Sequence, residues 1–224
     1  MEISAYLDGI WVPINQTIDL SPLSPGTHTL VVTAIDQPGW TTTREVTFNI
    51  IAITTTIDVN KQLNRDTRND IGNGRLVSKT TIVNTGNPLI KIQDQEQFPD
   101  SFTLQKLIVR IFDPSNPAYK YEVHPPFYTV QYGTYSVTIT INFPTTATLS
   151  YQNPDGTWTT QQITLNTLPT NWGAQFQTIL APPSELTPGT YTTTATITAW
   201  TAPNTYTVEI ATATLTIEEK KTPP

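Results

Sequence analysis

The residue types that most often perform chemistry are scarce in this chain. It has two histidines and no cysteine, so a thiolate nucleophile, a thiolate metal site and a disulfide framework are excluded. His28 lies at the start of a predicted strand, and His124 precedes two prolines that constrain the backbone. Zinc sites need clustered His or Cys, and no Gly-x-Ser-x-Gly elbow is present to hold a nucleophilic serine. We therefore predict a non-enzymatic protein with no catalytic residue, no cofactor and no bound metal.

Two acidic groups come closest to the pattern of a site. Asp66, Asp70 and Asn73 superficially resemble a calcium loop, but arginines intrude and no Glu closes the loop as an EF-hand requires. A polar, solvated loop is the simpler interpretation. Asp94 and Glu96 could form the carboxylate pair of a glycoside hydrolase. No row of sugar-stacking aromatics accompanies them, so an acidic hairpin is preferred.

The composition predicts an all-β fold. Charged residues make up 13% of the chain, against roughly 25% in ordinary globular proteins, and about a fifth of the residues are threonine. Threonine is β-branched, favours strands and leaves a hydroxyl for the wet face of a sheet, while 19 prolines interrupt helices. We expect tandem antiparallel β-sandwiches of Ig-like or jelly-roll type.

Charge and hydropathy exclude two classes of partner. With a net charge of −6 and 12 Lys and Arg residues, the chain has no basic footprint for nucleic acid. No apolar stretch approaches the roughly 20 residues that span a bilayer. The first residues, MEISAYLDGIW, lack the basic and apolar regions of a signal peptide. We expect a chain that is assembled inside a cell or cut from something longer.

An internal repeat is the most informative feature of the sequence. The sequence DGIW at 8–11 is followed by LSPGTHT at 23–29, and DGTW at 155–158 is followed by LTPGTYT at 186–192. An Asp-Gly pair favours a tight hairpin turn, and a Pro-Gly turn feeds an alternating strand. Both copies therefore predict a hairpin, a turn and a core strand in the same order.

The repeat makes two pairs of residues equivalent. His28 corresponds to Tyr191, which predicts a packing or surface position for His28 rather than a ligand role. Trp11 corresponds to Trp158, and an aromatic ring just after a hairpin is expected to cap one end of a sandwich core.

The pattern resembles the Ig-like modules of prokaryotic surface proteins, over residues 1–52 and more loosely over 145–219. The segment between them resembles the repeat domains of bacterial and archaeal surface proteins, in which a Lys-bearing first strand precedes an Asn-Thr-Gly turn. Lys61, VNTGN at 83–87 and Pro99 match that outline. The resemblance implies a structural rather than a catalytic role.

The resemblance also implies a covalent bond, because sandwich domains in some surface filaments carry an internal Lys–Asn isopeptide bond. Lys61 on the first strand of the middle segment and Asn142 on its last strand would be neighbours in a sandwich. A carboxylate, Asp94 or Glu122, would be needed to move protons. The alternative is that Lys61 extends its amine to solvent.

The predicted organisation has four parts: an Ig-like half-module at 1–52, a β-sandwich with the NTGN motif at 53–143, an Ig-like module at 144–219 and a tail at 220–224. Two larger jelly rolls that divide near residue 140 are the alternative. The first copy of the repeat lacks leading strands, and an uncovered half-sandwich exposes apolar surface and strand edges. We expect strands of the middle segment to complete it.

Three functions fit this organisation. The preferred one is a virion subunit of a capsid vertex or turret, in the style of the multi-sandwich vertex proteins of archaeal icosahedral viruses. The alternative is part of a cell-envelope protein: a surface layer, an adhesin stalk or a filament. A carbohydrate-binding accessory module is the third. For the first two we expect the partners to be copies of the chain or other structural subunits, located at a virion surface or in the extracellular cell envelope.

Overall fold

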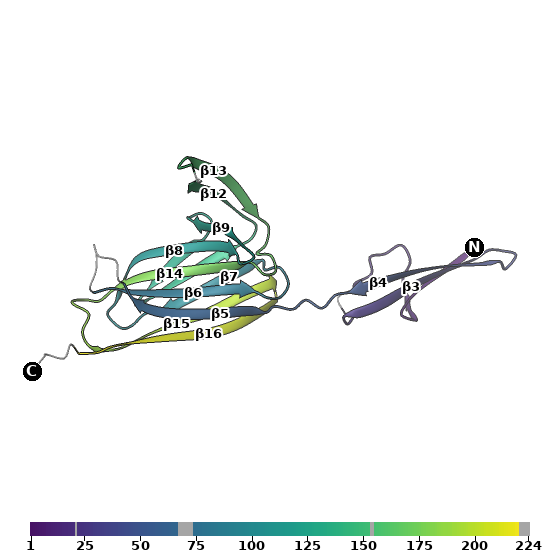
Figure 1. Ribbon diagram of the computed structural model, residues 1–224. Helices are drawn as coiled ribbons and strands as arrows, with labels where there is room; N and C mark the ends of the chain where they lie inside the picture. The colour runs from purple at the N-terminus through teal and green to yellow at the C-terminus, as the bar shows by residue number, and fades with distance from the viewer. Residues whose placement is uncertain (21, 67–73, 153–154, 220–224) are drawn as a thin grey trace, which may run out of the picture. The chain divides into compact units, whose positions relative to one another are not determined.

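The computed structural model describes residues 1–20, 22–66, 74–152 and 155–219. Every helix or strand among these residues is a β-strand, and every strand pair is antiparallel. The predicted all-β fold is confirmed. The chain forms an N-terminal unit, Met1–Ile53, and a C-terminal unit, Thr54–Pro224 (Figure 1).

The N-terminal unit is built on a single four-stranded sheet with the order β2-β1-β3-β4. Its strands are β1 (Glu2–Leu7), β2 (Ile10–Val12), β3 (Gly26–Ile35) and β4 (Thr41–Ile50). One face carries Ala5, Leu7 and Val12, and the segment between β2 and β3 lays Ile18 and Leu23 against them. This small cluster is the whole core of the unit among the described residues.

We expected strands from about 53–143 to complete this half-module, and within the sheet itself no such strand is added. The sheet contains only β1 to β4, and the irregular segment between β2 and β3 covers part of its apolar face. Several large apolar side chains of the unit stay exposed: Ile10 (73%), Trp11 (62%) and Trp40 (76%). Trp11 therefore does not cap a core, and the side chain of Trp158 lies outside the described residues.

The C-terminal unit is a sandwich of two five-stranded sheets. One has the order β5-β6-β14-β8-β9 and the other β10-β11-β7-β15-β16, while β12 and β13 form a separate hairpin. The strands are β5 (Ile57–Arg65), β6 (Leu76–Asn84), β7 (Lys91–Gln97), β8 (Thr103–Asp113), β9 (Asn116–Val123), β10 (Thr129–Gly133), β11 (Ser136–Asn142), β12 (Thr145–Gln152), β13 (Trp158–Leu165), β14 (Gly173–Ala181), β15 (Gly189–Ala202) and β16 (Thr205–Ile217).

Alternation of buried and half-buried side chains forms the core between these sheets. Every second residue is buried along β6 and β11 and over residues 193–199 of β15, as a strand with one wet face requires. The largest fully buried side chains include Ile82, Phe176, Ile92, Ile139 and Ile197. The first two come from one sheet and the other three from the opposite sheet, so both sheets share one core.

The C-terminal unit does not divide into two domains at residues 143 and 144. β14 lies between β6 and β8, and β15 lies beside β7, so strands from the second half of the unit fill central positions in both sheets. Residues 144–219 are therefore not a separate module, and two jelly rolls that divide near residue 140 are not formed. The two copies of the sequence repeat form corresponding antiparallel hairpins, β3–β4 and β15–β16.

The NTGN motif holds the backbone that leads into β5 in place. Asn84 is fully buried and donates from Nδ2 to the carbonyls of Asn87 (3.0 Å) and Leu168 (3.1 Å), while its Oδ1 accepts from the amide of Gly86 (3.0 Å). The side chain of Asn87 in turn accepts from the amide of Thr54 (2.8 Å). The motif is a polar clamp that ties three segments of backbone together.

Candidate functional site

The most unusual feature of the C-terminal unit is a group of ionisable side chains inside the sandwich. On β5, Lys61 shares the inward face with Ile57 and Leu63. On β7, Asp94 and Glu96 occupy inward positions that alternate with outward glutamines. Alternation along a strand therefore places one amine from the first sheet opposite two carboxyl groups from the second.

Lys61 and Glu96 form a buried ion pair across the two sheets. The Lys61 Nζ lies 2.5 Å from Glu96 Oε2, and the two side chains are 1% and 0% exposed. Nζ also donates to Ser78 Oγ and Thr80 Oγ1, each at 3.0 Å, and the Thr80 hydroxyl donates to the other oxygen of Glu96. All three hydrogens of the ammonium group thus have acceptors, as a buried charge requires.

Asp94 lacks such support. Its side chain is fully buried, and neither carboxyl oxygen accepts a hydrogen bond from an N–H or O–H donor among the described residues, although the Glu96 carboxyl lies within hydrogen-bond reach. Burial away from water, and then the neighbouring charge of Glu96, raise the pKa of Asp94 well above its usual range, against the opposing effect of Lys61. Two buried carboxyl groups side by side oppose each other's ionisation, which favours the protonated form of Asp94.

Hydroxyl groups line the rest of the cluster. Ser78 Oγ lies 3.2 Å from Thr193 Oγ1 on β15, which gives a second polar contact between the sheets. Thr178 on β14 pairs in register with Ser78 and is also fully buried. The cluster is therefore a polar layer, enclosed within an otherwise apolar core.

The structure does not bring Lys61 to Asn142. Asn142 is the last residue of β11, its side chain is exposed, and it lies opposite Lys91 on the outward face. Glu122, the second carboxylate considered for proton transfer, lies on β9 and pairs with Arg110 Nη2 at 3.2 Å. Of the residues singled out from the sequence, Lys61 and Asp94 come together.

Sequence reasoning missed the role of Glu96 as the partner of Lys61. The signal was present in the stretch KIQDQEQ, where alternation places both acids on the face of Ile92. A strand that buries this face must bury two carboxyl groups, which demands a cation from the opposite sheet. Lys61 is that cation.

The other candidate residues do not form a site in the described part of the chain. Asp66 is buried, whereas Asp70 and Asn73 lie outside the described residues. No group of three His, Cys, Asp or Glu side chains that could hold a metal ion occurs in the ranges that the structure describes. Within the same ranges, no helix is long and apolar enough to cross a membrane.

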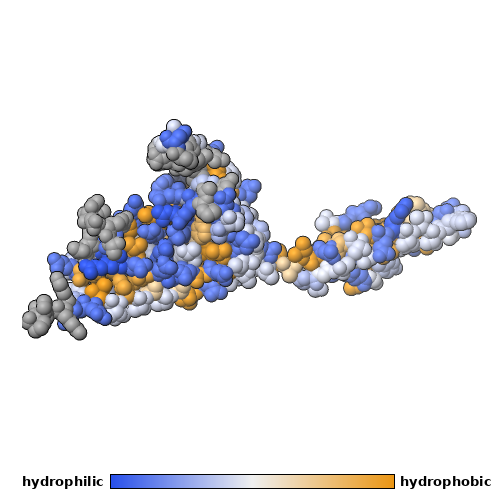
Figure 2. Space-filling view, in the orientation of Figure 1, coloured by the Kyte–Doolittle hydropathy of each residue, from blue (hydrophilic) through white to orange (hydrophobic). Residues whose placement is uncertain are grey.

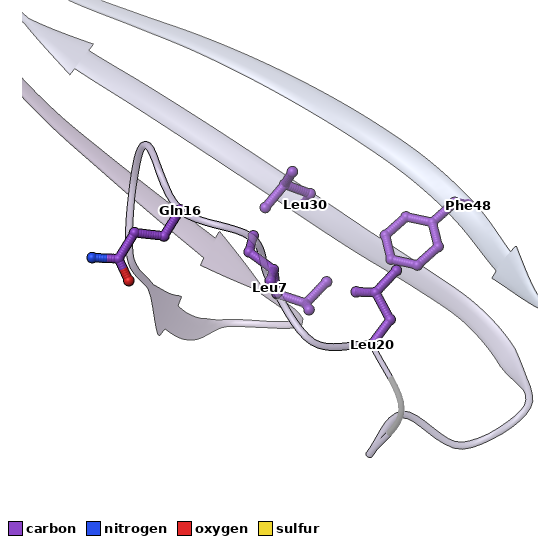
Figure 3. Close-up of a pocket in the computed structure, with 6 residues that line it drawn as sticks. Leu7, Gln16, Leu20, Leu30 and Phe48 are labelled. Carbon is purple, nitrogen blue, oxygen red and sulfur yellow. The ribbon is translucent and has the colours of Figure 1, made fainter.

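The apolar sheet face of the N-terminal unit has more than one hollow. Leu7, Leu20, Leu30 and Phe48 converge on one of about 260 Å³, and Gln16 lies at its rim (Figure 3). It is one of the parts of the face that the segment between β2 and β3 leaves uncovered.

A salt bridge joins the turn between β1 and β2 to β3 in the same sheet. The His28 Nδ1 lies 2.6 Å from Asp8 Oδ2, and Nε2 lies 2.7 Å from the Ser24 carbonyl oxygen. Both nitrogens face acceptors, so both carry hydrogen and the ring is cationic. The hydrogen bond to Asp8, and then that to Ser24, raise the pKa of His28, and the pKa of Asp8 is lowered mainly by the same bond.

The outward faces of the two large sheets differ in chemistry. On β5-β6-β14-β8-β9, charged groups such as Lys79, Arg110 and Glu122 lie between polar side chains. The outward positions of β7, β11 and β15 carry mainly hydroxyls and carboxamides, and Lys91 is the one charged group among the described residues at those outward positions. Figure 2 shows hydrophilic and hydrophobic residues interspersed over the visible surface of the unit.

No protein-family model matches the chain, and no curated protein is significantly similar to it in sequence. Solved structures with a related fold include the collagen-binding subdomain of the Enterococcus faecalis surface protein ACE, with 6% identity and a TM-score of 0.45 over 72% of this chain and 96% of that one. The collagen-binding domain of a Staphylococcus aureus adhesin has 7% identity and a TM-score of 0.40, over 70% and 95%. The major pilin subunit BcpA of Bacillus cereus has 13% identity and a TM-score of 0.43, over 94% and 61%.

Proposed function

We propose that the chain is a non-catalytic structural module of a cell-surface assembly, such as a stalk or a filament. The observation that carries the proposal is the cross-sheet cluster of Lys61, Glu96 and Asp94. It links β5, the first strand of the large unit, to β7, a central strand of the opposite sheet. A pulling force that reaches the unit through residue 54 would act first on β5, and the cluster would resist its separation from the other sheet.

The burial of this cluster supports a mechanical rather than a catalytic role. Catalytic carboxylates must reach a substrate, whereas the side chains of Lys61 and Glu96 are 1% and 0% exposed. The hydrolase pairing considered for Asp94 and Glu96 is therefore disfavoured, because a sugar has no access to either group.

The cell-envelope alternative is preferred here over the virion subunit. No feature of the described residues favours a virion over a cell surface. A chain of two β-units, one of them a sandwich with a buried clamp, suits a surface stalk at least as well. The proposed partners are neighbouring copies or other subunits of the same assembly.

Immunogold labelling with antibodies against residues 54–224 tests the location. We expect label on the envelope of intact producing cells, and a matched strain without the gene provides the control. Label on purified virus particles and not on cells would contradict the proposal and favour a virion subunit instead.

A second candidate function rests on the outward face of β7, β11 and β15, which is mostly uncharged. At one end of it, Lys91 Nζ lies 4.3 Å from the centre of the Trp200 ring, whose centroid is 6.0 Å from that of Tyr206. Aromatic rings beside hydroxyls and carboxamides suit a neutral polysaccharide. Sedimentation with insoluble cellulose or chitin tests this: retention that Tyr206→Ala abolishes and Tyr132→Ala leaves intact would favour it.

A further inference from the structure

We propose that the outer face of the N-terminal sheet, opposite the apolar hollows, binds a flat neutral polysaccharide such as cellulose or chitin through the rings of Trp11 and Tyr6. The two residues lie opposite each other in the register of β1 and β2, and they are 62% and 40% exposed. The inference goes beyond the proposed function, because it assigns a ligand to the smaller unit wherever the protein is located.

Alternation along the strands places both rings on this outer face. Ala5, Leu7 and Val12 belong to the small core of the unit, and successive side chains of a strand point to opposite faces of the sheet. Trp11 and Tyr6 are direct neighbours of these buried residues in the sequence, so they point away from the core. The ring that was expected to cap a core is instead available to a ligand.

The two rings begin a row that crosses the whole sheet. In the order β2-β1-β3-β4, the register aligns four residues: Trp11, Tyr6, Val31 and Glu45. Residues directly opposite each other on antiparallel strands lie about 4.5–5.5 Å apart, a spacing close to the length of one sugar unit in a β-linked chain. Consecutive sugar rings of an extended chain can therefore stack on the two aromatic rings through their C–H faces.

Hydroxyl groups lie on both sides of this row. One neighbouring row contains Ser4, Thr33 and Thr43, and the other contains Thr29 and Thr47. The hydroxyl oxygens of Thr33 and Thr43 are 3.3 Å apart, which forms a short ladder beside the rings. Hydroxyls donate and accept hydrogen bonds without carrying charge, so they match the hydroxyl groups along the edges of a sugar chain.

The charge of this face favours an uncharged ligand. Among the described residues, the outward positions of β1 to β4 carry two acidic groups, Glu2 and Glu45, and no lysine or arginine. Arg44 lies beside Val32 on the opposite face. A nucleic acid or an acidic polysaccharide would need cations beside the rings, whereas a neutral sugar chain needs none.

Depletion isotherms of the purified full chain on insoluble cellulose and on chitin test the proposal. We expect saturable binding to at least one of them, at the same affinity in low and high salt, because the contact contains no ion pair for salt to screen. Trp11→Ala and Tyr6→Ala should each raise the dissociation constant at least about tenfold, since aromatic side chains are among those whose truncation costs most at an interface. Trp11→Phe keeps a ring and should retain most of the affinity.

Trp40→Ala is the matched control. Its side chain is 76% exposed and precedes β4, outside the aromatic row, so this variant should bind as the unmodified chain does. Circular dichroism and the melting temperature show whether each variant is folded. If Tyr6→Ala is unfolded, the comparison of Trp11→Ala, Trp11→Phe and Trp40→Ala still decides the question, because both tryptophans are largely exposed.

Absence of binding of the unmodified chain to both polysaccharides would overturn the proposal, and so would a collapse of the affinity in high salt. An equal loss in Trp40→Ala and Trp11→Ala would indicate unspecific adsorption through exposed tryptophans. Binding that Tyr206→Ala removes and Trp11→Ala leaves intact would assign the ligand to the C-terminal unit. Self-association in sedimentation velocity that Trp11→Ala abolishes, without binding to either polysaccharide, would show that a second copy covers the row. Each of these results contradicts the proposal and leaves the location of the protein to the labelling experiment.

Discussion

The two repeat copies make the same local contact at equivalent positions, but with different residues. His28 donates from Nε2 to the carbonyl of Ser24, and Tyr191 donates from its hydroxyl to the carbonyl of Thr187, each at 2.7 Å. In both copies the donor lies four residues after the acceptor and fastens the Pro-Gly turn to the strand that follows. The prediction of a packing role for His28 agrees with this geometry, whereas its salt bridge to Asp8 could not be foreseen from the repeat, because Tyr191 has no such partner in its place.

The ionic contact of His28 makes the stability of the N-terminal unit depend on pH. The raised pKa of His28 means that its contribution is complete below its ordinary value of 6.5 and is lost as the pH rises through the folded value. The lowered pKa of Asp8 means that its contribution is present above its ordinary value of 3.8 and is lost as the pH falls through the folded value. We expect the unit to be most stable between these limits.

Fluorescence-detected unfolding of the N-terminal unit, followed from pH 5 to pH 9, checks this prediction. Stability should decline toward the alkaline end. His28→Tyr copies the other repeat and keeps a donor toward Ser24 without a group that titrates near neutrality. A decline that is equally steep in His28→Tyr would contradict the assignment.

At the scale of elements, the NTGN turn joins several backbone segments through one buried side chain. Asn84 satisfies two backbone carbonyls and one amide from inside the core, and removal of its side chain leaves those groups buried without partners. Asn84→Ala should lower the free energy of unfolding of the C-terminal unit by about 1–3 kcal/mol. Asn60→Ala, an exposed position on β5, is the control and should stay close to the unmodified value in denaturant titration. Equal effects at the two positions would show that the clamp contributes nothing.

Close packing of β14 against β8 provides a second test at this scale. A Cβ added to Gly173 would lie 2.3 Å from Cζ of Phe112 and 2.7 Å from the carbonyl oxygen of Ile82, so the ring or the strand must shift. Gly173→Ala should destabilise the unit by about 1–3 kcal/mol. Gly74→Ala meets no atom of the described residues nearer than 4.0 Å and is the matched control. Thermal unfolding that shows no difference between the two variants would indicate a looser contact.

At the scale of the whole molecule, the strand content could be predicted from the sequence, but the pairing of strands could not. Threonine content and period-two alternation are local properties of the sequence, and they predicted an all-β chain. The repeat predicted a boundary close to residue 53. Which strands lie side by side depends on contacts between distant segments, such as β14 with β6 and β8. The same limit applies to the cluster: the sequence indicated Lys61 and a nearby carboxylate, but the choice of Asp94 and Glu96 over Asn142 followed from the arrangement of the sheets.

The arrangement of strands predicts which truncations fold. Because β14 occupies the centre of one sheet and β15 lies beside β7 in the other, a chain of residues 54–143 would lack central strands of both sheets and expose its core. Residues 54–224 contain every strand of the sandwich and should fold alone. We expect the longer piece to melt cooperatively, at the temperature at which the same unit melts in the full chain, and the shorter piece to be unfolded or aggregated by circular dichroism and size-exclusion chromatography. A cooperative transition for 54–143 would favour the three-part organisation predicted from the repeat. A large fall in the melting temperature of 54–224 relative to the full chain would show that the N-terminal unit stabilises the sandwich.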